Sequence, residues 1–319
     1  MKELRIGLIG CAGRGTLADH ANLPGKARVV AGADRYPEQR QMFLDRYREK
    51  YRTEPAVYTD YREMIDKEQL DGVVIASPDF LHEEHAVYAL EHRVPVYLEK
   101  PIAIAIDSAD RILEAAYAGR TKLVIGHNMR YMAFVRKMKE IIDAGTIGEV
   151  RAVWCRHFVS YGGDAYFRDW HARKAYSNSL LLQKGAHDID VIHFLAGSRT
   201  VRVNGMGNLS VYDKLPRRPA GEERIREGIA SVWKTDHWPP LEQKELYPVI
   251  EVEDVNMINM QLANGVMASY EQCFYTPDTC RNYTVIGTRG RLENYGDYSP
   301  KSDIQIWTRR TDNFRLEGD

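Results

Sequence analysis

The sequence predicts an α/β protein with two domains: a doubly wound parallel sheet in residues 1–126 and an α+β domain built on a largely antiparallel sheet in residues 127–319. Strand and helix patterns alternate up to Gly126, and repeated βα units of this length indicate a parallel sheet. After Asn128 several strand patterns follow one another with short turns between them, which favours antiparallel pairing. The chain length fits two domains of about 100–200 residues each.

In the first domain we expect a strand, a helix and a further strand to recur without interruption. Strands are expected over Leu4–Ile9, Arg28–Ala33, Ala56–Tyr58, Leu70–Ala76, Val94–Leu98 and Lys122–Gly126. Helices are expected over Arg14–Asn22, Pro37–Tyr51, from about Asp60, over Leu81–His92, and up to Ala118 with Asp107 as the capping residue. The third long strand, Leu70–Ala76, is a near-continuous apolar run, as expected for a strand buried on both faces.

The second domain has fewer helices and more strands. Helical patterns cover Phe134–Ala144 and Leu180–Leu195. Strand patterns cover Val150–Tyr161, Thr200–Tyr212, Val255–Leu262, Val266–Phe274, Asn282–Gly287 and Ile304–Thr308. The polar stretch Lys214–Pro248 has little periodicity, and long irregular segments of this kind are usually functional or disordered.

Composition and charge exclude several kinds of partner. A formal net charge of −1 argues against nucleic acid or an anionic membrane as the main partner. No segment approaches the roughly 20 apolar residues that a membrane span needs, and Met1 leads directly into a strand, so no secretory signal is expected. The four cysteines show no metal-binding or redox spacing, which predicts a cytoplasmic protein without a metal site.

A glycine-rich turn follows the first strand and opens the first helix. Gly10, Ala12, Gly13, Arg14 and Gly15 occupy the place of a dinucleotide fingerprint, in which glycines let a pyrophosphate approach a helix N-terminus. Alanine stands at the second glycine position, so the match is imperfect. Alone, this motif equally suits a structural turn.

Asp34 ends the second strand, where a carboxylate can accept hydrogen bonds from both ribose hydroxyls of an adenosine. The alternative is an aspartate that only caps the next helix. A carboxylate at this position repels a 2′-phosphate, which favours NAD over NADP, although the neighbouring Arg35 leaves room for NADP.

Two further strand ends carry polar residues toward the same edge of the sheet, where ligands bind in open parallel sheets. Ser77 and Pro78 end one strand, and Glu99 and Lys100 end the next. We expect all four to contact the cofactor, with Glu99 holding the lysine ammonium in place. The alternative for Lys100 is a solvated lysine. His82, on the helix after Pro78, is expected at the surface or at the edge of the cofactor rather than on a metal.

A second polar cluster lies on the Leu180–Leu195 helix. Gln183 and His187 are four residues apart, and His187 and Asp190 three apart, so these pairs share a face. A histidine with a carboxylate one turn away has the arrangement that proton transfer requires. The alternative is a core histidine that is satisfied by Asp190.

These residues together resemble the Gfo/Idh/MocA oxidoreductases, the family of glucose–fructose oxidoreductase and inositol 2-dehydrogenase. The resemblance covers nearly the whole chain. It is carried by the glycine turn, Ser77-Pro78, Glu99-Lys100-Pro101, Gly126–Tyr131, Gly148-Glu149-Val150, Gly185-x-His187-x-x-Asp190 and Asn264-Gly265 in a hairpin. The family implies a Rossmann domain, a nicotinamide cofactor, sugar or polyol substrates, and a second domain whose sheet often mediates oligomers, here a dimer or tetramer.

The chain departs from the family pattern at Gln183, where members often carry an aspartate four residues before the catalytic histidine. An amide can bind a hydroxyl but cannot relay a proton, and Lys184 can supply a positive charge instead. The chain also ends soon after its last predicted strand, earlier than many relatives, and the resemblance therefore leaves open whether a terminal element is missing.

The resemblance predicts an NAD(P)-dependent dehydrogenase, with NAD the expected cofactor, that acts on a hydroxyl carbon of a sugar, cyclitol or related polyol. Lys100 and His187 are its expected catalytic residues, with the proton assigned to His187 and hydroxyl polarisation to Lys100. Two alternatives stay open: transient oxidation that enables elimination or glycoside cleavage, and a non-catalytic NAD-binding sensor. The candidate substrate-binding residues are Lys100, Arg130, Tyr131, His157, Tyr161, Arg168, Trp170, His171, Gln183, Lys184 and His187.

Overall fold

The computed structural model describes residues 2–222, 240–297 and 302–310. It separates into two compact units, of which the first contains Met1–His127 together with Ala175–Asn178 and the second contains Asn128–Lys174 and Ser179–Asp319. The segment Ala175–Asn178 belongs to the first unit because two of its side chains bind there. Tyr176 packs its ring against Phe80, and Asn178 donates a 2.8 Å hydrogen bond to the carbonyl of Ile104.

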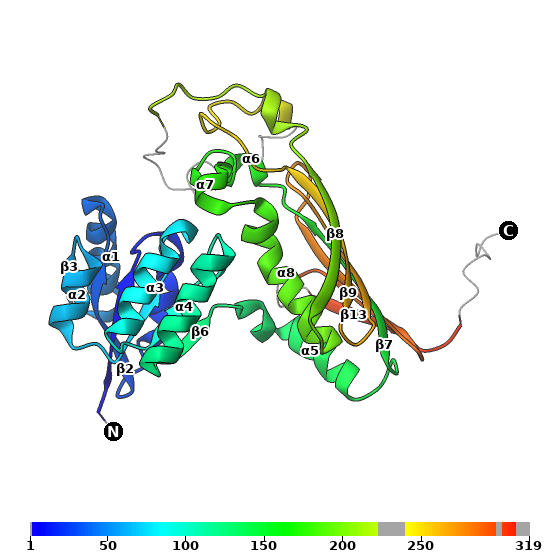
Figure 1. Cartoon of the computed structure of the whole chain (residues 1–319), viewed down its shortest axis with the longest axis horizontal. Coiled ribbons are helices and arrows are strands. Elements are labelled where there is room, and N and C mark those ends of the chain that lie inside the picture. The colour runs from blue at the N-terminus through cyan, green and yellow to red at the C-terminus, as the bar shows by residue number, and fades with distance from the viewer. Residues whose placement is uncertain (1, 223–239, 298–301, 311–319) are drawn as a thin grey trace. The chain divides into compact units, whose positions relative to one another are not determined.

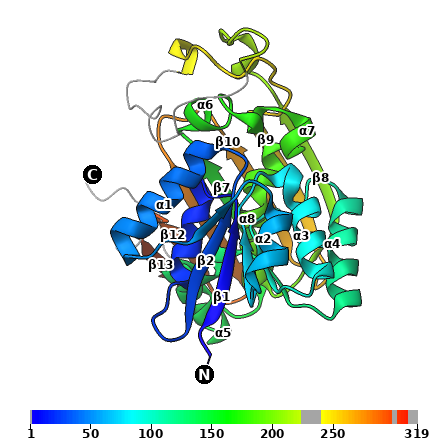
Figure 2. The same ribbon diagram turned by 90° about the vertical axis from the view of Figure 1, so that its left-hand side faces the viewer.

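The first unit is a six-stranded parallel sheet in the order β3-β2-β1-β4-β5-β6, which confirms the doubly wound sheet. Its strands are β1 (Leu4–Ile9), β2 (Ala27–Ala33), β3 (Ala56–Tyr58), β4 (Gly72–Ile75), β5 (Val96–Leu98) and β6 (Leu123–Ile125). Its helices are η1 (Gly13–Ala21), α1 (Pro37–Tyr51), α2 (Tyr61–Glu68), η2 (Asp79–Leu81), α3 (His82–Glu91) and α4 (Ile106–Gly119). Helices α2, α3 and α4 lie together on one side of the sheet and α1 on the other (Figure 2).

Three expectations for this unit need correction. The first helix is a 3₁₀ helix rather than an α-helix. Helix α4 begins at Ile106, one residue before the predicted cap Asp107, and Ala105 at its N-cap makes no side-chain bond. The strand predicted over Leu70–Ala76 is shorter, because its first residues lie in the turn that brings the chain back to the sheet. Only in this strand does the apolar pattern extend beyond the hydrogen-bonded element.

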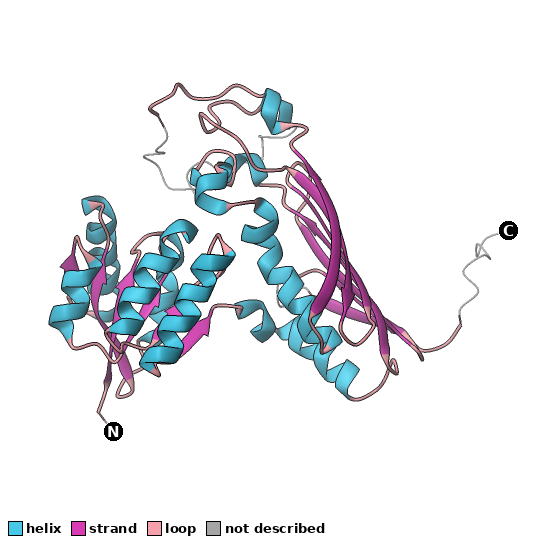
Figure 3. Ribbon diagram, viewed as in Figure 1, coloured by secondary structure: helices cyan, strands magenta, loops and turns pink. Residues whose placement is uncertain are grey.

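The second unit is a seven-stranded sheet in the order β13-β12-β11-β7-β10-β9-β8, with helices on one face (Figures 1 and 3). Every pairing is antiparallel except β7 with β10, which confirms the largely antiparallel sheet. Its strands are β7 (Val150–Phe158), β8 (Thr200–Asn208), β9 (Val255–Leu262), β10 (Met267–Cys273), β11 (Cys280–Gly287), β12 (Arg291–Tyr295) and β13 (Asp303–Trp307). Its helical segments are η3 (Asn128–Tyr131), α5 (Ala133–Asp143), α6 (Gly162–Ala165), η4 (Trp170–Ala172), α7 (Lys174–Ser177, mostly in the first unit), α8 (Leu180–Ala196), η5 (Tyr212–Lys214) and η6 (Pro240–Glu242).

Strand β12 was not expected from the sequence, because its pattern alternates only one apolar residue with charged and amide groups. The buried Asn294 explains how such a strand is held: its amide accepts from the N–H of Tyr283 at 2.7 Å and donates to the carbonyls of Arg281 and Gly296. The strand predicted to reach Tyr212 ends at Asn208. Much of the predicted irregular stretch Lys214–Pro248 lies outside the described residues.

Candidate active site

The glycine turn after β1 has the close contacts that a dinucleotide turn requires. Gly10 has φ +89°, and a Cβ added to it would lie 2.7 Å from the backbone nitrogen of Ser77. A Cβ on Gly15 would lie 2.3 Å from the Gly10 carbonyl oxygen. Ala12, at the imperfect position, has φ −84° and ψ 169°, an extended conformation that any residue adopts. Alanine at this position is therefore compatible with the turn.

Asp34 follows β2 and is bound to this turn. Its Oδ2 accepts a 3.0 Å hydrogen bond from the N–H of Cys11, and its Oδ1 accepts one of 3.0 Å from Tyr36. Each carboxylate oxygen has a second lone pair, so the side chain keeps capacity for a ribose hydroxyl. Arg35 is exposed and places its guanidinium over the ring of Tyr36, 4.6 Å from the centroid.

Lys100 follows β5 and is only 9% exposed, so it is not a solvated lysine. The carboxylate of the adjacent, buried Glu99 lies 3.4 Å from the guanidinium of Arg14. Arg14, in η1 just after the open turn at Gly13, thereby connects the end of β1 to the end of β5. Glu99 was expected to hold Lys100, and the structure pairs it with this arginine.

His82 is fully buried, so the surface position expected for it is wrong, and its expected place at the edge of the cofactor stays a prediction. Its Nδ1 lies 2.7 Å from the carbonyl oxygen of Pro101 and its Nε2 lies 3.0 Å from that of Ser77. Ser77 also hydrogen-bonds His85 Nδ1 at 2.9 Å, and Pro78 leads into η2. Burial lowers the pKa of both histidines to about 4. His82 therefore ties the segment after β4 to the segment after β5.

The second predicted cluster lies on α8, whose N-terminus is capped on two sides. The Ser179 hydroxyl accepts from the N–H of Leu182 at 3.0 Å, a bond that typically contributes about 1 kcal/mol to helix stability. The carboxylate of Glu253 accepts from the N–H of Leu181 at 2.7 Å. Gly185 brings the helix close to the sheet, since a Cβ there would lie 3.0 Å from the ring of Tyr270.

Asp190 binds Arg130, which was predicted to bind substrate. Arg130 Nε donates to Asp190 Oδ2 at 2.7 Å and its Nη2 donates to Oδ1 at 2.6 Å. The planar guanidinium matches a carboxylate with two parallel bonds. Helical spacing can indicate only partners on the same helix. The sequence therefore predicted His187, one turn away, as the partner of Asp190. In the structure Gln183 is buried and His187 is half-buried.

The side chains expected to bind sugar divide into two groups. Lys184 donates to the Tyr161 hydroxyl at 3.0 Å and lies 5.0 Å from the ring centroid of Tyr166. That ring meets His171 edge-on at 5.0 Å, and His171 stacks on Trp170 at 3.7 Å. These contacts connect Lys184 to Trp170 through one continuous chain of aromatic side chains. Of the other candidates, Arg168 donates to the Lys244 carbonyl, and Tyr131 is 79% exposed.

A buried polar network was missed by sequence reasoning. Asp188, next to His187 but on the sheet side of α8, is 0% exposed and is surrounded by Arg281, Tyr270, Tyr283 and His157. His157 was predicted to bind substrate, yet its Nδ1 lies 3.1 Å from Asp188 and its Nε2 accepts from Arg281 at 3.1 Å. Both ring nitrogens are thus engaged within the network. No spacing in the sequence relates these strand residues to the helix.

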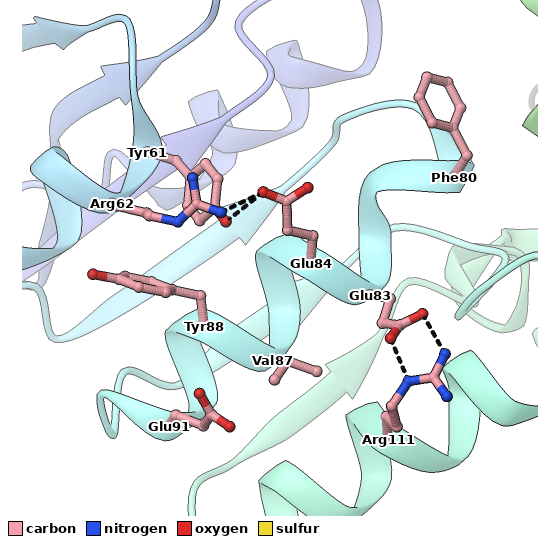
Figure 4. Close-up of a pocket in the computed structure, with 9 residues that line it drawn as sticks. All are labelled: Tyr61, Arg62, Phe80, Glu83, Glu84, Val87, Tyr88, Glu91 and Arg111. Carbon is pink, nitrogen blue, oxygen red and sulfur yellow. Dashed lines mark hydrogen bonds and ion pairs between the residues drawn. The ribbon is translucent and has the colours of Figure 1, made fainter.

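A surface groove of about 480 Å³ in the first unit has none of the predicted site residues in its lining (Figure 4). Four of its five charged side chains are paired with one another: Glu84 with Arg62 at 2.6 Å, and Glu83 with Arg111. The groove is lined by Tyr61, Arg62, Phe80, Glu83, Glu84, Val87, Tyr88, Glu91 and Arg111. We do not assign the active site to it, because it contains none of the strand ends that the sheet presents to a ligand.

Comparison with models of known protein families shows which family this chain belongs to. Residues 4–127 match the model of an oxidoreductase family with an NAD-binding Rossmann fold, and residues 135–293 match the GFO/IDH/MocA C-terminal domain. The chain belongs to the Gfo/Idh/MocA family. The expected resemblance is confirmed over both units.

Relatives within the Gfo/Idh/MocA family include enzymes named for inositol. The chain is 28% identical over 272 residues to the putative oxidoreductase YteT of Bacillus subtilis, which covers 75% of this chain and 64% of that protein. It is 33% identical over 200 residues to an inositol 2-dehydrogenase of Burkholderia multivorans. That match covers 61% of this chain and 55% of the relative. The chain thus spans less than two thirds of the length of these relatives.

Solved structures of the family share the fold. Aldose–aldose oxidoreductase from Caulobacter crescentus superposes with a TM-score of 0.73 at 20% identity, covering 96% of this chain and 81% of that one. Scyllo-inositol dehydrogenase from Lactobacillus casei, with NAD(H) and scyllo-inositol bound, superposes with a TM-score of 0.69 at 22% identity, covering 92% and 76%.

Among the described residues, no helix is both long and apolar enough to cross a bilayer. No group of three or more His, Cys, Asp or Glu side chains in the same part of the chain is placed to hold a metal ion.

Proposed function

We propose that this protein is an NAD-dependent dehydrogenase that oxidises a hydroxyl carbon of a sugar, cyclitol or related polyol. The observation that carries the proposal is Lys100, a largely buried lysine at the end of β5 in a sheet whose β1 and β2 ends hold the glycine turn and Asp34. Membership of the Gfo/Idh/MocA family supports the same reaction class. The names of several relatives, inositol 2-dehydrogenases, support a polyol substrate.

The residues at the ends of β1 and β2 fit a dinucleotide. A Cβ at Gly10 or Gly15 would collide with the backbone of Ser77 or Gly10, so both glycines are needed for the tight turn between β1 and η1. A turn of this kind before a helix N-terminus suits a pyrophosphate, which accepts hydrogen bonds from backbone N–H groups. Asp34 is the group for the adenosine ribose, and its charge favours NAD over NADP. When bound, the nicotinamide supplies the hydride acceptor that alcohol oxidation needs.

We assign the proton of the substrate hydroxyl to His187 and the polarisation of its oxygen to Lys100. Lysine titrates near 10.4 when unperturbed, so Lys100 acts first as a hydrogen-bond donor to a developing alkoxide. Gln183 replaces the acidic residue that many relatives carry, and its amide is suited to binding a hydroxyl rather than to moving a proton. The aromatic residues around Lys184 offer a stacking surface for a sugar ring.

We also propose that the protein forms a homo-oligomer through the second unit's sheet. Trp154 on β7, Met257 on β9 and Met267 on β10 are exposed, and each alternates with residues that pack against the helices. An apolar face of this kind marks an interaction surface. Sedimentation at micromolar concentration should show a dimer or tetramer that Trp154→Glu disrupts. A monomeric wild type would contradict the proposal.

The function is tested by following NADH absorbance with a panel of aldoses, uronic acids, inositols and alditols. Thermal shift with NAD present identifies ligands first, because a ligand that binds the folded state raises the melting temperature. A substrate should give stoichiometric NADH. A ligand that is consumed without net NADH supports transient oxidation instead, and binding without any conversion supports a sensor.

A further inference from the structure

The carboxylate of Asp188 joins α8 to the three central strands of the second unit's sheet. Its Oδ1 lies 2.7 Å from Arg281 Nε and accepts a bond from the Tyr283 hydroxyl, both on β11. Its Oδ2 lies 3.1 Å from His157 Nδ1 on β7 and accepts a 3.1 Å bond from the Tyr270 hydroxyl on β10. Four side chains from three adjacent strands therefore converge on one carboxylate.

Burial makes these bonds strong and costly to lose. Burial alone would raise the pKa of Asp188, but Arg281 and His157 hold it well below its usual range. Burial alone would likewise lower the pKa of Arg281, and Asp188 raises it instead. The second carboxylate near Arg281, that of Asp297, lies 3.4 Å from Nη1. A buried group of this kind is stable only when all its members are satisfied.

The network determines which way α8 faces. Successive residues of an α-helix are about 100° apart, so with Asp188 toward the sheet, His187 lies about 100° and Gln183 about 140° around the axis. Apolar contacts alone allow packed helices to slide by about 1–2 Å. Asp188 restricts such sliding, because its carboxylate accepts directional hydrogen bonds from the hydroxyls of Tyr283 and Tyr270. The charge of Arg281, 2.7 Å from Oδ1, adds a close electrostatic contact. A rotation of about 10° would move an atom about 6 Å from the axis by about 1 Å.

We propose that Asp188 is a positioning residue, which fixes the rotation of α8 and thereby the direction in which His187 and Gln183 present their side chains to the substrate. The consequence for turnover rests on the proposed dehydrogenase function. The orientation of His187 itself does not depend on that function. A displacement of about 1 Å can cost about 100-fold in rate.

Asp188→Asn tests this in the full chain. We expect kcat to fall by about 100-fold at a temperature where the variant is folded, while the affinity for NAD is unchanged because the cofactor residues lie in the first unit. The rate at which diethylpyrocarbonate modifies His187, followed by mass spectrometry, should also change. Tyr283→Phe removes one donor without altering charge, keeps the test available if Asp188→Asn does not fold, and should give a smaller change in the same direction.

Two controls separate positioning from stability. Leu195→Ala removes a buried side chain from the same sheet-facing side of α8, so it should lower the melting temperature but leave kcat and His187 modification near wild type. Asp188→Asn combined with Arg281→Gln removes both charges and should regain thermal stability without regaining kcat.

The results that would overturn the proposal are specific. If the double variant recovers kcat, Asp188 only balances the charge of Arg281. If Leu195→Ala lowers kcat and changes His187 modification as much as Asp188→Asn does for the same loss of melting temperature, the network is only structural. If the wild type converts no polyol, but His187 modification changes in Asp188→Asn and not in Leu195→Ala, the proposed function fails and the positioning role remains.

Discussion

Acidification should destabilise the second unit because His157 is buried without a charge. Its neutral ring can donate from Nδ1 to Asp188 and accept at Nε2 from Arg281. Burial, reinforced by the Arg281 charge, lowers the pKa from 6.5 to about 4 despite the opposing pull of Asp188. The unfolded chain therefore takes up a proton between these values that the folded protein does not.

The sign and size of the effect follow from linkage. Above about pH 6.5 both states hold a neutral ring and stability is full; below that pH the unfolded state binds more protons and stability falls. A difference of about 2.5 pKa units corresponds to about 3 kcal/mol in total, of which about 2 kcal/mol is lost by about pH 5. At that pH an unperturbed aspartate, at about 3.9, is still ionised, so Asp188 does not yet contribute.

Urea unfolding followed by tryptophan fluorescence measures this directly. The first unit contains no tryptophan, so a change of tryptophan fluorescence does not come from its own residues, and the described tryptophans Trp154, Trp170 and Trp307 belong to the second unit. His157→Gln is the matched control, since its amide keeps a donor and an acceptor but does not titrate. The free energy of unfolding should fall by about 2 kcal/mol more in the wild type than in His157→Gln between about pH 7.5 and pH 5. If the free energy of unfolding falls equally with pH in the two proteins, the conclusion that His157 is buried in its neutral form is wrong.

Four further changes test the predicted site. Asp34→Ser should reduce the preference for NAD over NADP measured by calorimetry, and tighter NADP binding by the wild type would contradict that assignment. Lys100→Met should keep NAD affinity but lower kcat by about 10²–10⁴-fold; unchanged kcat would remove Lys100 from the chemistry. His187→Asn should abolish an ionisation in the pH profile of kcat/KM near about 6.5, and an unaltered profile would make that histidine structural. Gly15→Ala should weaken NAD binding, since its Cβ would lie 2.3 Å from a carbonyl oxygen, whereas Gly72→Ala, with its nearest atom at 3.5 Å, should not; equal affinities would show that the turn can relax.

The sequence by itself determined the parts of this protein that local physics controls. Strands β1 and β3 and helix α1 have the predicted bounds, because periodicity and a proline at the first helical turn are properties of neighbouring residues. The sequence also predicted that the glycine turn and Asp34 lie at the same edge of the sheet, because the carboxyl ends of parallel strands share one edge. The family was recognisable from the same motifs.

Tertiary structure alone decided which polar side chains meet. Helical spacing offered only His187 as a partner for Asp190, whereas in the structure Arg130, 60 residues earlier, binds this carboxylate with two hydrogen bonds. The alternating pattern of β7 does not show which of its polar side chains are buried, and the structure turns His157 inward to Asp188. Arg281, 93 residues after Asp188 in the sequence, contacts the same carboxylate. A buried charge needs partners wherever the fold can bring them. Those partners come from strand order and register, which no local pattern of residues contains.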